Sequence, residues 1–262
     1  MRLDVYLTSA GYCPSRTQAK EWIEGGFVSV NGKVIRKASF VIEDNASPEI
    51  ALSGKPHPFV GRGGVKLEGA LNAFGVNVSG KICADIGAST GGFTDCLLRR
   101  GAAKVFAVDS GSDQLDKSLR EDGRVVNIER FNARNLTPET FGTLCDIAVA
   151  DLSFISQTYV LPNIRDILRP GGIYIGLIKP QFECGPHATD RRGIVKNKAD
   201  HEAAVRRVRD SASACSLFMQ ELIVSPITGG DGNREFLCLC VHSDGKETCS
   251  VTDQLISKVV RS

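Results

Sequence analysis

The chain has 262 residues, 42% hydrophobic and 24% charged, with a formal net charge of +2, which is typical of a globular protein with one large core and a small additional module. No apolar run approaches the roughly 20 residues that a membrane-spanning helix needs, and the first residues lack the apolar core of a signal peptide. The nine cysteines include no C-x-x-C pair, so we expect a cytoplasmic protein without a bound metal.

The first 50 residues predict two helices followed by short strands. Ser15 and Gln18 have the spacing of a capping box, so the second helix should begin there, run to about Ile23 and stop at Gly25-Gly26. Asn31-Gly32 between two short apolar runs is typical of a two-residue hairpin turn. This part of the chain therefore predicts a small α+β module.

Basic side chains concentrate in this module. Arg16 and Lys20 lie one helical turn apart, and Arg36 and Lys37 follow the hairpin. A basic helix face beside a basic ribbon suits the backbone of an RNA duplex or stem-loop, so we predict phosphate contacts at these residues and at Arg62. Spacing alone leaves a merely solvated charged face equally open.

From about residue 63 the pattern changes to strands alternating with helices, which predicts a parallel sheet covered on both faces. We expect a domain at 1–55, a Pro- and Gly-containing linker at 56–62, and an α/β domain at 63–262. The expected helices are 65–74, 93–100, 160–168 and 198–214. The expected strands are 81–86, 104–109, 125–128, 145–151 and 173–179, followed by a hairpin of 221–228 and 235–242.

The loop between the strand at 81–86 and the helix at 93–100 is rich in glycine, which lets a backbone approach a ligand closely. It lacks the Lys-Ser/Thr pair of a P-loop, and Ser89 stands at the second glycine position of a dinucleotide fingerprint. Asp109 ends the next strand, where a carboxylate can accept hydrogen bonds from both ribose hydroxyls of a nucleoside cofactor. The pattern favours S-adenosyl-L-methionine, with a dinucleotide or no cofactor as the alternatives.

A lysine ends a buried strand in the stretch Gly-Leu-Ile-Lys-Pro-Gln-Phe-Glu, where an uncompensated ammonium would be costly. This residue, Lys179, has three charged companions near other strand or helix ends: Asp151, Glu235 and Lys66. Each alone has the character of a surface charge or a simple ion pair. Because the carboxyl ends of parallel strands form one edge of a sheet, the four residues are expected to converge there.

Two parts of the sequence resemble known families. The first 50 residues, with their Arg-Leu-Asp opening and Gly-x-Val-x-Val-Asn-Gly ribbon, resemble the α-L RNA-binding module of a ribosomal protein and several RNA-modifying enzymes. Nearly the whole chain resembles the TlyA family of haemolysin A-like, FtsJ-like ribosomal RNA 2′-O-methyltransferases. The segments that carry this resemblance are VGRGGVKLEGAL, ADIGASTGGFTDCLLRRGA, VFAVDSG, NARNL, VADLSFIS, GLIKPQFE and GNREFL.

The resemblance implies a Rossmann-like class I methyltransferase sheet with S-adenosyl-L-methionine as cofactor. It implies ribosomal RNA, free or in assembled subunits, as the partner, with cytidine in 16S or 23S RNA as the target. The family's catalytic tetrad maps onto Lys66, Asp151, Lys179 and Glu235. The expected cofactor contacts are Asp85, Gly87, Ala88, Ser89, Thr90, Gly91, Gly92, Asp109, Asn132, Ala133 and Arg134, and a helix cap or an ion pair is the alternative role of Asn132 and Arg134.

A ribose 2′-hydroxyl is a weak acid, so methyl transfer to it needs positioning and removal of a proton. We assign the base role to Lys179, with Lys66 favouring its neutral form or binding an RNA phosphate, and with Asp151 and Glu235 orienting the lysines. Two other functions stay open at this stage. One is a membrane-active haemolysin, although no membrane is expected as partner, and the other is an RNA-binding protein without catalytic activity.

Overall fold

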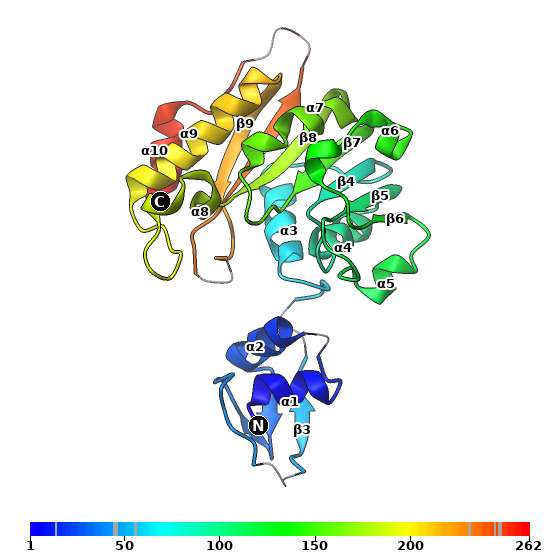
Figure 1. Ribbon diagram of the computed structural model, residues 1–262, viewed down its shortest axis with the longest axis vertical. Coiled ribbons are helices and arrows are strands. Elements are labelled where there is room, and N and C mark those ends of the chain that lie inside the picture. Colours follow the sequence, from blue (N-terminus) through cyan, green and yellow to red (C-terminus); the bar gives the residue numbers. More distant parts are fainter. Residues whose placement is uncertain (14, 44–46, 55–56, 230–231, 244, 246–247) are drawn as a thin grey trace. The chain divides into compact units, whose positions relative to one another are not determined.

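The computed structural model describes residues 1–13, 15–43, 47–54, 57–229, 232–243, 245 and 248–262 (Figure 1). The chain divides into two compact units, Met1–Pro58 and Phe59–Ser262. The first unit has one hydrophobic core, and the second has two. In the described part of the chain, no helix combines the length and the apolar character needed to cross a membrane.

The first unit consists of two helices and a small antiparallel sheet with the strand order β2-β1-β3. The side chain of Ser15 accepts a hydrogen bond from the Gln18 amide, and Gly26 ends the helix in the left-handed conformation (φ 80°), as the sequence predicts. Asn31 and Gly32 both have positive φ, which the predicted hairpin turn requires. The elements are α1 (Leu3–Ser9), α2 (Arg16–Gly25), β1 (Val28–Val30), β2 (Lys33–Val34) and β3 (Ile50–Leu52).

The second unit is built on a seven-stranded sheet with the order β6-β5-β4-β7-β8-β10-β9. The five strands from β6 to β8 are parallel, and β10 pairs antiparallel with both β8 and β9. The predicted Rossmann-like α/β fold is therefore confirmed. The strands are β4 (Ile82–Ile86), β5 (Lys104–Val108), β6 (Val125–Ile128), β7 (Cys145–Ala150), β8 (Leu168–Ile178), β9 (Leu217–Val224) and β10 (Phe236–His242).

Helices cover both faces of this sheet, because successive strand residues enter opposite cores. On β7, Ile147 and Val149 pack with α3 and α4, whereas Ala148 and Ala150 pack with α7, α9 and α10. The longer helices are α3 (Gly63–Ala73), α4 (Gly92–Arg99), α7 (Leu161–Ile167), α9 (Lys198–Ala214) and α10 (Asp253–Arg261). The short helices α5 (Lys117–Arg120), α6 (Pro138–Phe141) and α8 (Pro180–Glu183) lie in the connections.

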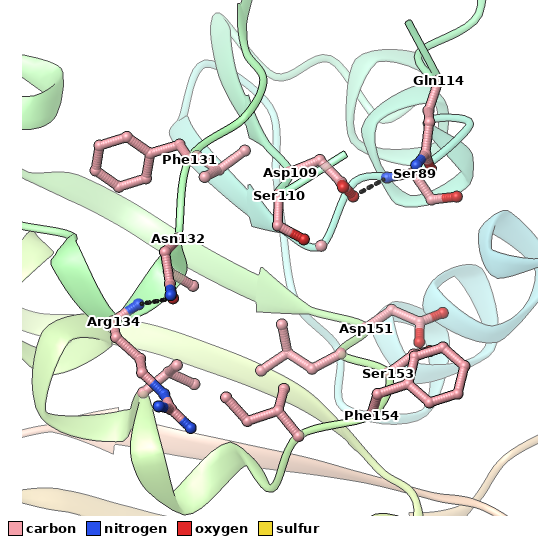
Figure 2. A pocket seen from close by; sticks show the side chains of 16 residues that line it. Ser89, Asp109, Ser110, Gln114, Phe131, Asn132, Arg134, Asp151, Ser153 and Phe154 are labelled. Atoms are coloured by element: carbon pink, nitrogen blue, oxygen red, sulfur yellow. Dashed lines mark hydrogen bonds between the residues drawn. The ribbon is translucent and has the colours of Figure 1, made fainter. Parts of the chain in front are cut away.

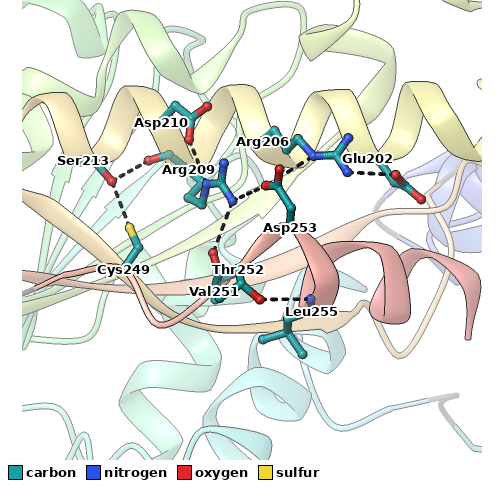
Figure 3. A network of polar contacts seen from close by, with 10 residues as sticks. All are labelled: Glu202, Arg206, Arg209, Asp210, Ser213, Cys249, Val251, Thr252, Asp253 and Leu255. Carbon is teal, nitrogen blue, oxygen red and sulfur yellow. Dashed lines mark hydrogen bonds and ion pairs between the residues drawn. The ribbon is translucent and has the colours of Figure 1, made fainter.

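The last helix, α10, was not expected from the sequence. Its apolar side packs into the core through Ile256 and Val260, both fully buried. Its first residue, Asp253, binds Arg209 of α9, with 2.6 Å between Oδ1 and Nη1, and Thr252 caps the helix by accepting a bond from the Leu255 amide (Figure 3). The helix is thus joined to α9 by a buried apolar contact and by an ion pair whose aspartate is exposed and whose arginine is mostly covered.

We expect the apolar contact to stabilise α10 far more than the ion pair does. Replacing Ile256→Ala removes a fully buried side chain and should lower the free energy of unfolding by about 2–4 kcal/mol. Asp253→Ala is the matched comparison on the same helix and should cost much less, since the Asp253 side chain is exposed to solvent. Urea denaturation of both variants measures the difference, and equal losses would contradict this account.

Candidate active site

A pocket of about 600 Å³ opens where the parallel strands β4, β5 and β7 end. Figure 2 shows Asp109 and Ser89 on one side of it, Asn132 and Arg134 on a second, and Asp151 on a third. The remaining lining residues are Gly87, Val108, Ser110, Gln114, Phe131, Ala133, Leu152, Ser153, Phe154, Ile155 and Val160. This is the end of an open α/β sheet at which ligands bind.

Asp109 lies in this pocket with both carboxylate oxygens engaged by backbone. Its Oδ2 accepts a hydrogen bond from the Ser89 amide (2.7 Å), and its Oδ1 accepts one from the Gly111 amide (2.7 Å). These bonds fix the carboxylate in place. Each oxygen has a second lone pair, so the group can still accept bonds from a pair of ligand hydroxyls.

Gly87 shows why glycine is needed at the end of β4. It has a φ of 86°, and a Cβ built there would lie 2.7 Å from the carbonyl oxygen of Asp151. Gly91 also has positive φ, but its missing Cβ makes room for Leu119 rather than for the pocket. Of the residues expected to contact the cofactor, five lie outside the lining: Asp85, Ala88, Thr90, Gly91 and Gly92.

Asp85 is fully buried beneath the glycine loop. Its Oδ2 accepts a hydrogen bond from the Thr94 hydroxyl (2.7 Å), and its Oδ1 has no hydrogen-bond partner in the described structure. Burial raises the pKa of Asp85 to about 7, and the bond from Thr94 opposes this shift. A buried carboxylate oxygen that accepts no hydrogen bond from the protein can accept one from a donor group of a bound ligand.

Asn132 and Arg134 combine a structural role with a place in the pocket. The Asn132 side chain caps the short 3₁₀ helix Ala133–Asn135, with its Oδ1 3.0 Å from the Arg134 amide. The guanidinium of Arg134 lies 4.9 Å from the centre of the Tyr159 ring. Asn132 therefore has the helix-cap role given above as its alternative. Arg134 contacts an aromatic ring, which differs from the ion pair given as its alternative.

The four charged residues form two ion pairs: Lys66–Glu235 is buried, and Lys179–Asp151 joins a buried lysine to a partly exposed carboxylate. Lys66 Nζ lies 2.6 Å from Glu235 Oε2, and these residues are only 7% and 2% exposed. Lys179 Nζ lies 2.6 Å from Asp151 Oδ1 and donates a hydrogen bond to Ser153 Oγ (2.8 Å). Each lysine thus has its own carboxylate. This pairing offsets the free-energy cost of removing the two charges from water.

Strand register brings the two pairs to one place. Phe236 of β10 is opposite Ile178 of β8, so Glu235 and Lys179 are the next residues at the same end of these strands. On the other side, a Cβ built on Gly63 would lie 3.8 Å from Asp151 Oδ2, and Gly63 precedes Lys66 by one turn of α3. The four residues thus converge at one edge of the sheet, and Asp151 among them lines the pocket.

A family model described as FtsJ-like methyltransferase matches residues 59–241, and one described as S4 domain matches residues 1–46. The chain belongs to the FtsJ-like methyltransferase family. This membership confirms the prediction of a methyltransferase that uses S-adenosyl-L-methionine. The S4 match agrees with the predicted RNA-binding character of the N-terminal module.

The relatives of this methyltransferase match over almost its whole length. The "Putative rRNA methyltransferase YqxC" of Bacillus subtilis is 42% identical over 99% of this chain and 92% of its own. The "16S/23S rRNA (cytidine-2′-O)-methyltransferase TlyA" of Mycobacterium tuberculosis is 41% identical over 93% of this chain and 91% of its own. A solved structure titled "Putative hemolysin from Streptococcus thermophilus" has a TM-score of 0.81 and 39% identity, covering 100% of this chain and 94% of that one.

Phe154 is a feature of the methyltransferase site that the sequence pattern did not indicate. Its side chain is 91% exposed, and its φ of 64° places a bulky residue in the left-handed region. Its ring lies 5.4 Å from the ring of Phe182, which in turn lies 5.8 Å from Lys179 Nζ. An exposed aromatic ring thus lies close to the Lys179–Asp151 pair.

Glu183 is a second residue that the sequence reasoning missed. It lies at the end of α8, is almost fully buried, and accepts hydrogen bonds from the Ser156 hydroxyl and the Gln157 amide. Burial raises the pKa of Glu183. Because α8 follows Lys179 and Ser156 follows Asp151 in the chain, Glu183 connects the two segments that carry one ion pair.

Four of the residues predicted to bind RNA are exposed in the first unit, and three of these also make contacts within the protein. Arg16 Nη2 lies 3.1 Å from Asp4 Oδ2, and Lys20 Nζ lies 3.9 Å from Glu24 Oε1. Arg36 Nη1 donates to the carbonyl oxygen of Glu24 (3.4 Å), so it lies near the end of α2. Arg16 thus lies at the start of α2, while Lys20 and Arg36 contact Glu24 near its end.

Lys37 is exposed beside this group. Arg62 belongs to the second unit, where its Nη2 donates to the carbonyl oxygen of Thr228 (3.0 Å). Arg62 therefore contacts the loop that leads to Glu235. In the described residues, no cluster of His, Cys, Asp and Glu has the arrangement to hold a metal ion.

We expect Glu183 to act by positioning the loop after Asp151. Glu183→Ala leaves two buried donors without an acceptor and should lower the free energy of unfolding by about 1–3 kcal/mol. It should also lower kcat for methyl transfer, whereas Glu183→Gln, which keeps an acceptor oxygen, should restore most of both. Thermal unfolding and single-turnover methyl transfer are the measurements. A loss of stability with unchanged kcat would show that Glu183 has a structural role alone.

Proposed function

We propose that this protein methylates the 2′-hydroxyl of a ribose in ribosomal RNA, in the cytoplasm, with cytidine of 16S or 23S RNA as the target nucleotide. The observation that carries the proposal is that Asp151, which lines a nucleoside-sized pocket, pairs with the buried Lys179 at the strand ends where Lys66 pairs with Glu235. The similarity to a cytidine-2′-O-methyltransferase of Mycobacterium tuberculosis supports the choice of nucleotide. The partner is ribosomal RNA, either free or within an assembled subunit.

The residues of the pocket fit S-adenosyl-L-methionine, which supplies an electrophilic methyl group on a sulfonium. Asp109 is held by two backbone amides and has lone pairs for the ribose hydroxyls. The unpaired Oδ1 of Asp85 offers a buried acceptor near the loop at which the amino acid end would bind. Asn132 and Arg134 line the remaining side of the pocket, where we place the adenine.

Lys179 is the group that we assign to take the proton from the ribose 2′-hydroxyl. Nζ accepts this proton in its neutral amine form and becomes an ammonium, which Asp151 Oδ1 at 2.6 Å and Ser153 Oγ at 2.8 Å stabilise. The ammonium returns the proton to water before the next turnover. Asp151 also fixes the direction of Nζ, much as the carboxylate of a hydrolase triad orients its base. Transfer then requires only that the 2′-oxygen lie in line with the methyl group.

The second pair, Lys66–Glu235, takes no part in the proton transfer from the 2′-hydroxyl. Glu235 holds the Lys66 ammonium at 2.6 Å inside the protein, so the positive charge lies at a fixed place near the incoming RNA. A fixed ammonium can bind a phosphate without paying for the ordering of a flexible side chain. We therefore assign to Lys66 the positioning of the RNA backbone.

Phe154 is suited to receive the target base. The Phe154 ring is 91% exposed, so a base that stacks on it removes apolar ring surface from water. Stacking of this kind contributes about 1–3 kcal/mol to the binding free energy. Its neighbour Phe182 supports the ring from one side, which leaves the other face for the nucleotide. The ribose of a base stacked there would lie close to Lys179.

The base role of Lys179 predicts the effect of two substitutions. Lys179→Ala should lower kcat by about 10²- to 10⁴-fold, the range for loss of a general base. Lys179→Arg keeps the positive charge but cannot accept a proton, so it should lose nearly as much activity. The measurement is transfer of labelled methyl groups to ribosomal subunits and to free ribosomal RNA, followed by nucleoside mapping. Normal binding of S-adenosylhomocysteine is the control, and an active Lys179→Arg variant would contradict the assignment.

Asp85 predicts a pH dependence of cofactor binding. Because its pKa is raised to about 7 in the free protein, the carboxyl is protonated below this pH and ionised above it. A cationic amine binds the ionised form better, so the affinity for S-adenosylhomocysteine should rise from pH 6 to pH 8 with release of a proton. Calorimetry in buffers with different ionisation heats measures this release. Asp85→Asn should bind more weakly and with much less pH dependence, and an unchanged profile would contradict the role of Asp85.

A further inference from the structure

A short hairpin between α8 and α9 carries two arginines at its tip. Thr189 and Val195 form an isolated antiparallel bridge, and the Gly193 amide donates to the carbonyl oxygen of Asp190 (2.9 Å). Gly193 has a φ of 75°, as a tight turn requires. Arg191 and Arg192 occupy the two central positions of this turn and are exposed. We refer to residues 189–196 as the arginine hairpin.

The carboxylate of Asp190 makes this turn rigid. Its Oδ1 accepts hydrogen bonds from the amides of Arg192 (2.8 Å) and Ile194 (3.0 Å), and its Oδ2 lies 2.8 Å from Lys196 Nζ. The bond from Lys196, together with those from the two amides, lowers the pKa of Asp190 to about 2. The Asp190 carboxylate is therefore already engaged by backbone amides and by Lys196.

Among the described residues, the two arginine side chains of the hairpin have no counter-charge. In the part of the chain that the structure describes, neither Arg191 nor Arg192 has an acidic side chain within ion-pair distance. Most other arginines of the second unit are engaged, as Arg206 is with Glu202 and Arg209 is with Asp253. Two adjacent exposed guanidinium groups on a rigid turn form a site of concentrated positive charge.

A buried asparagine fixes the arginine hairpin next to the catalytic residues. Asn233 is 2% exposed, its Oδ1 accepts a bond from the Val195 amide (3.0 Å), and its Nδ2 donates to the carbonyl oxygen of Gly193 (3.0 Å). Asn233 is two residues from Glu235, which holds Lys66. In Figure 1 the yellow hairpin and the orange segment before β10 extend from the same end of the second unit.

We propose that the arginine hairpin binds phosphate groups of the RNA strand whose ribose is methylated. Guanidinium groups form bidentate bonds with phosphate oxygens, and a turn that is already rigid loses little entropy on binding. Its anchor beside Glu235 places these contacts on nucleotides that flank the target. The methyltransferase unit thus holds RNA by itself, in addition to the basic residues of the first unit. This inference rests on RNA as the substrate.

The test compares two double variants that each remove two positive charges. Arg191→Gln with Arg192→Gln removes the proposed contacts, while Lys81→Gln with Lys104→Gln removes charge at the amino ends of β4 and β5, at the opposite edge of the sheet. Binding to ribosomal RNA purified from bacterial ribosomes is measured at several salt concentrations with S-adenosylhomocysteine present. Thermal unfolding and S-adenosylhomocysteine affinity show that the folded state is intact.

We expect the arginine variant to bind RNA about tenfold more weakly near 0.1 M salt, and the slope of log affinity against log salt to fall by about 1 to 2. The lysine control should keep the slope of the unaltered protein. An Arg191→Lys, Arg192→Lys variant should keep most of the slope, because its charge is retained. Equal losses in the arginine variant and the control would overturn the proposal, since bulk charge would then explain the effect.

The experiment separates this inference from the proposed function. If the unaltered protein binds RNA but transfers no methyl group to it, the proposed function fails, while the binding slopes still decide the role of the hairpin. If methyl transfer occurs and the arginine variant has an unchanged KM for RNA, the hairpin proposal fails alone. A raised KM with unchanged kcat at saturating RNA supports the hairpin contact.

Discussion

Two lysine ammonium groups lie inside the methyltransferase unit, and each depends on one carboxylate for compensation. Removing either partner of a buried ion pair leaves an uncompensated charge, at a cost of about 3–5 kcal/mol. Lys66 with Glu235 and Lys179 with Asp151 therefore form a neutral group whose members cannot be changed singly without loss. This requirement ties four separate segments of the chain to the same edge of the sheet.

The sheet topology meets that requirement through its strand order. Parallel strands β7 and β8 place Asp151 and Lys179 side by side, and the antiparallel strand β10 returns to bring Glu235 opposite Lys179. The glycine at position 87 lets β4 approach β7 closely enough for the cofactor loop to lie beside Asp151. The proposed cofactor site and the proposed proton acceptor, Lys179, are thus adjacent because the same strand ends build both.

Local anchors then fix the loops around this centre. Glu183 holds the segment after Asp151, and Asn233 holds the arginine hairpin, each through hydrogen bonds to backbone amides in a buried setting. Buried polar groups of this kind specify one loop conformation, because every alternative would leave a donor or acceptor without a partner. Rigid loops around exposed groups such as Phe154 and Arg191 are what a site needs to hold a large, flexible RNA.

The sequence by itself determined the features that depend on neighbours in the chain: the Ser15 cap, the Asn31-Gly32 turn, the alternation of strands and helices, and the family resemblance that selected the tetrad. The tertiary structure alone decided which charges pair, since Lys66 and Glu235 are 169 positions apart and no local pattern relates them. It also decided that Phe154 is exposed and Glu183 buried, because burial depends on contacts between distant segments rather than on residue type. For the same reason α10 was missed: its apolar side gains stability only once α9 and the sheet are in place.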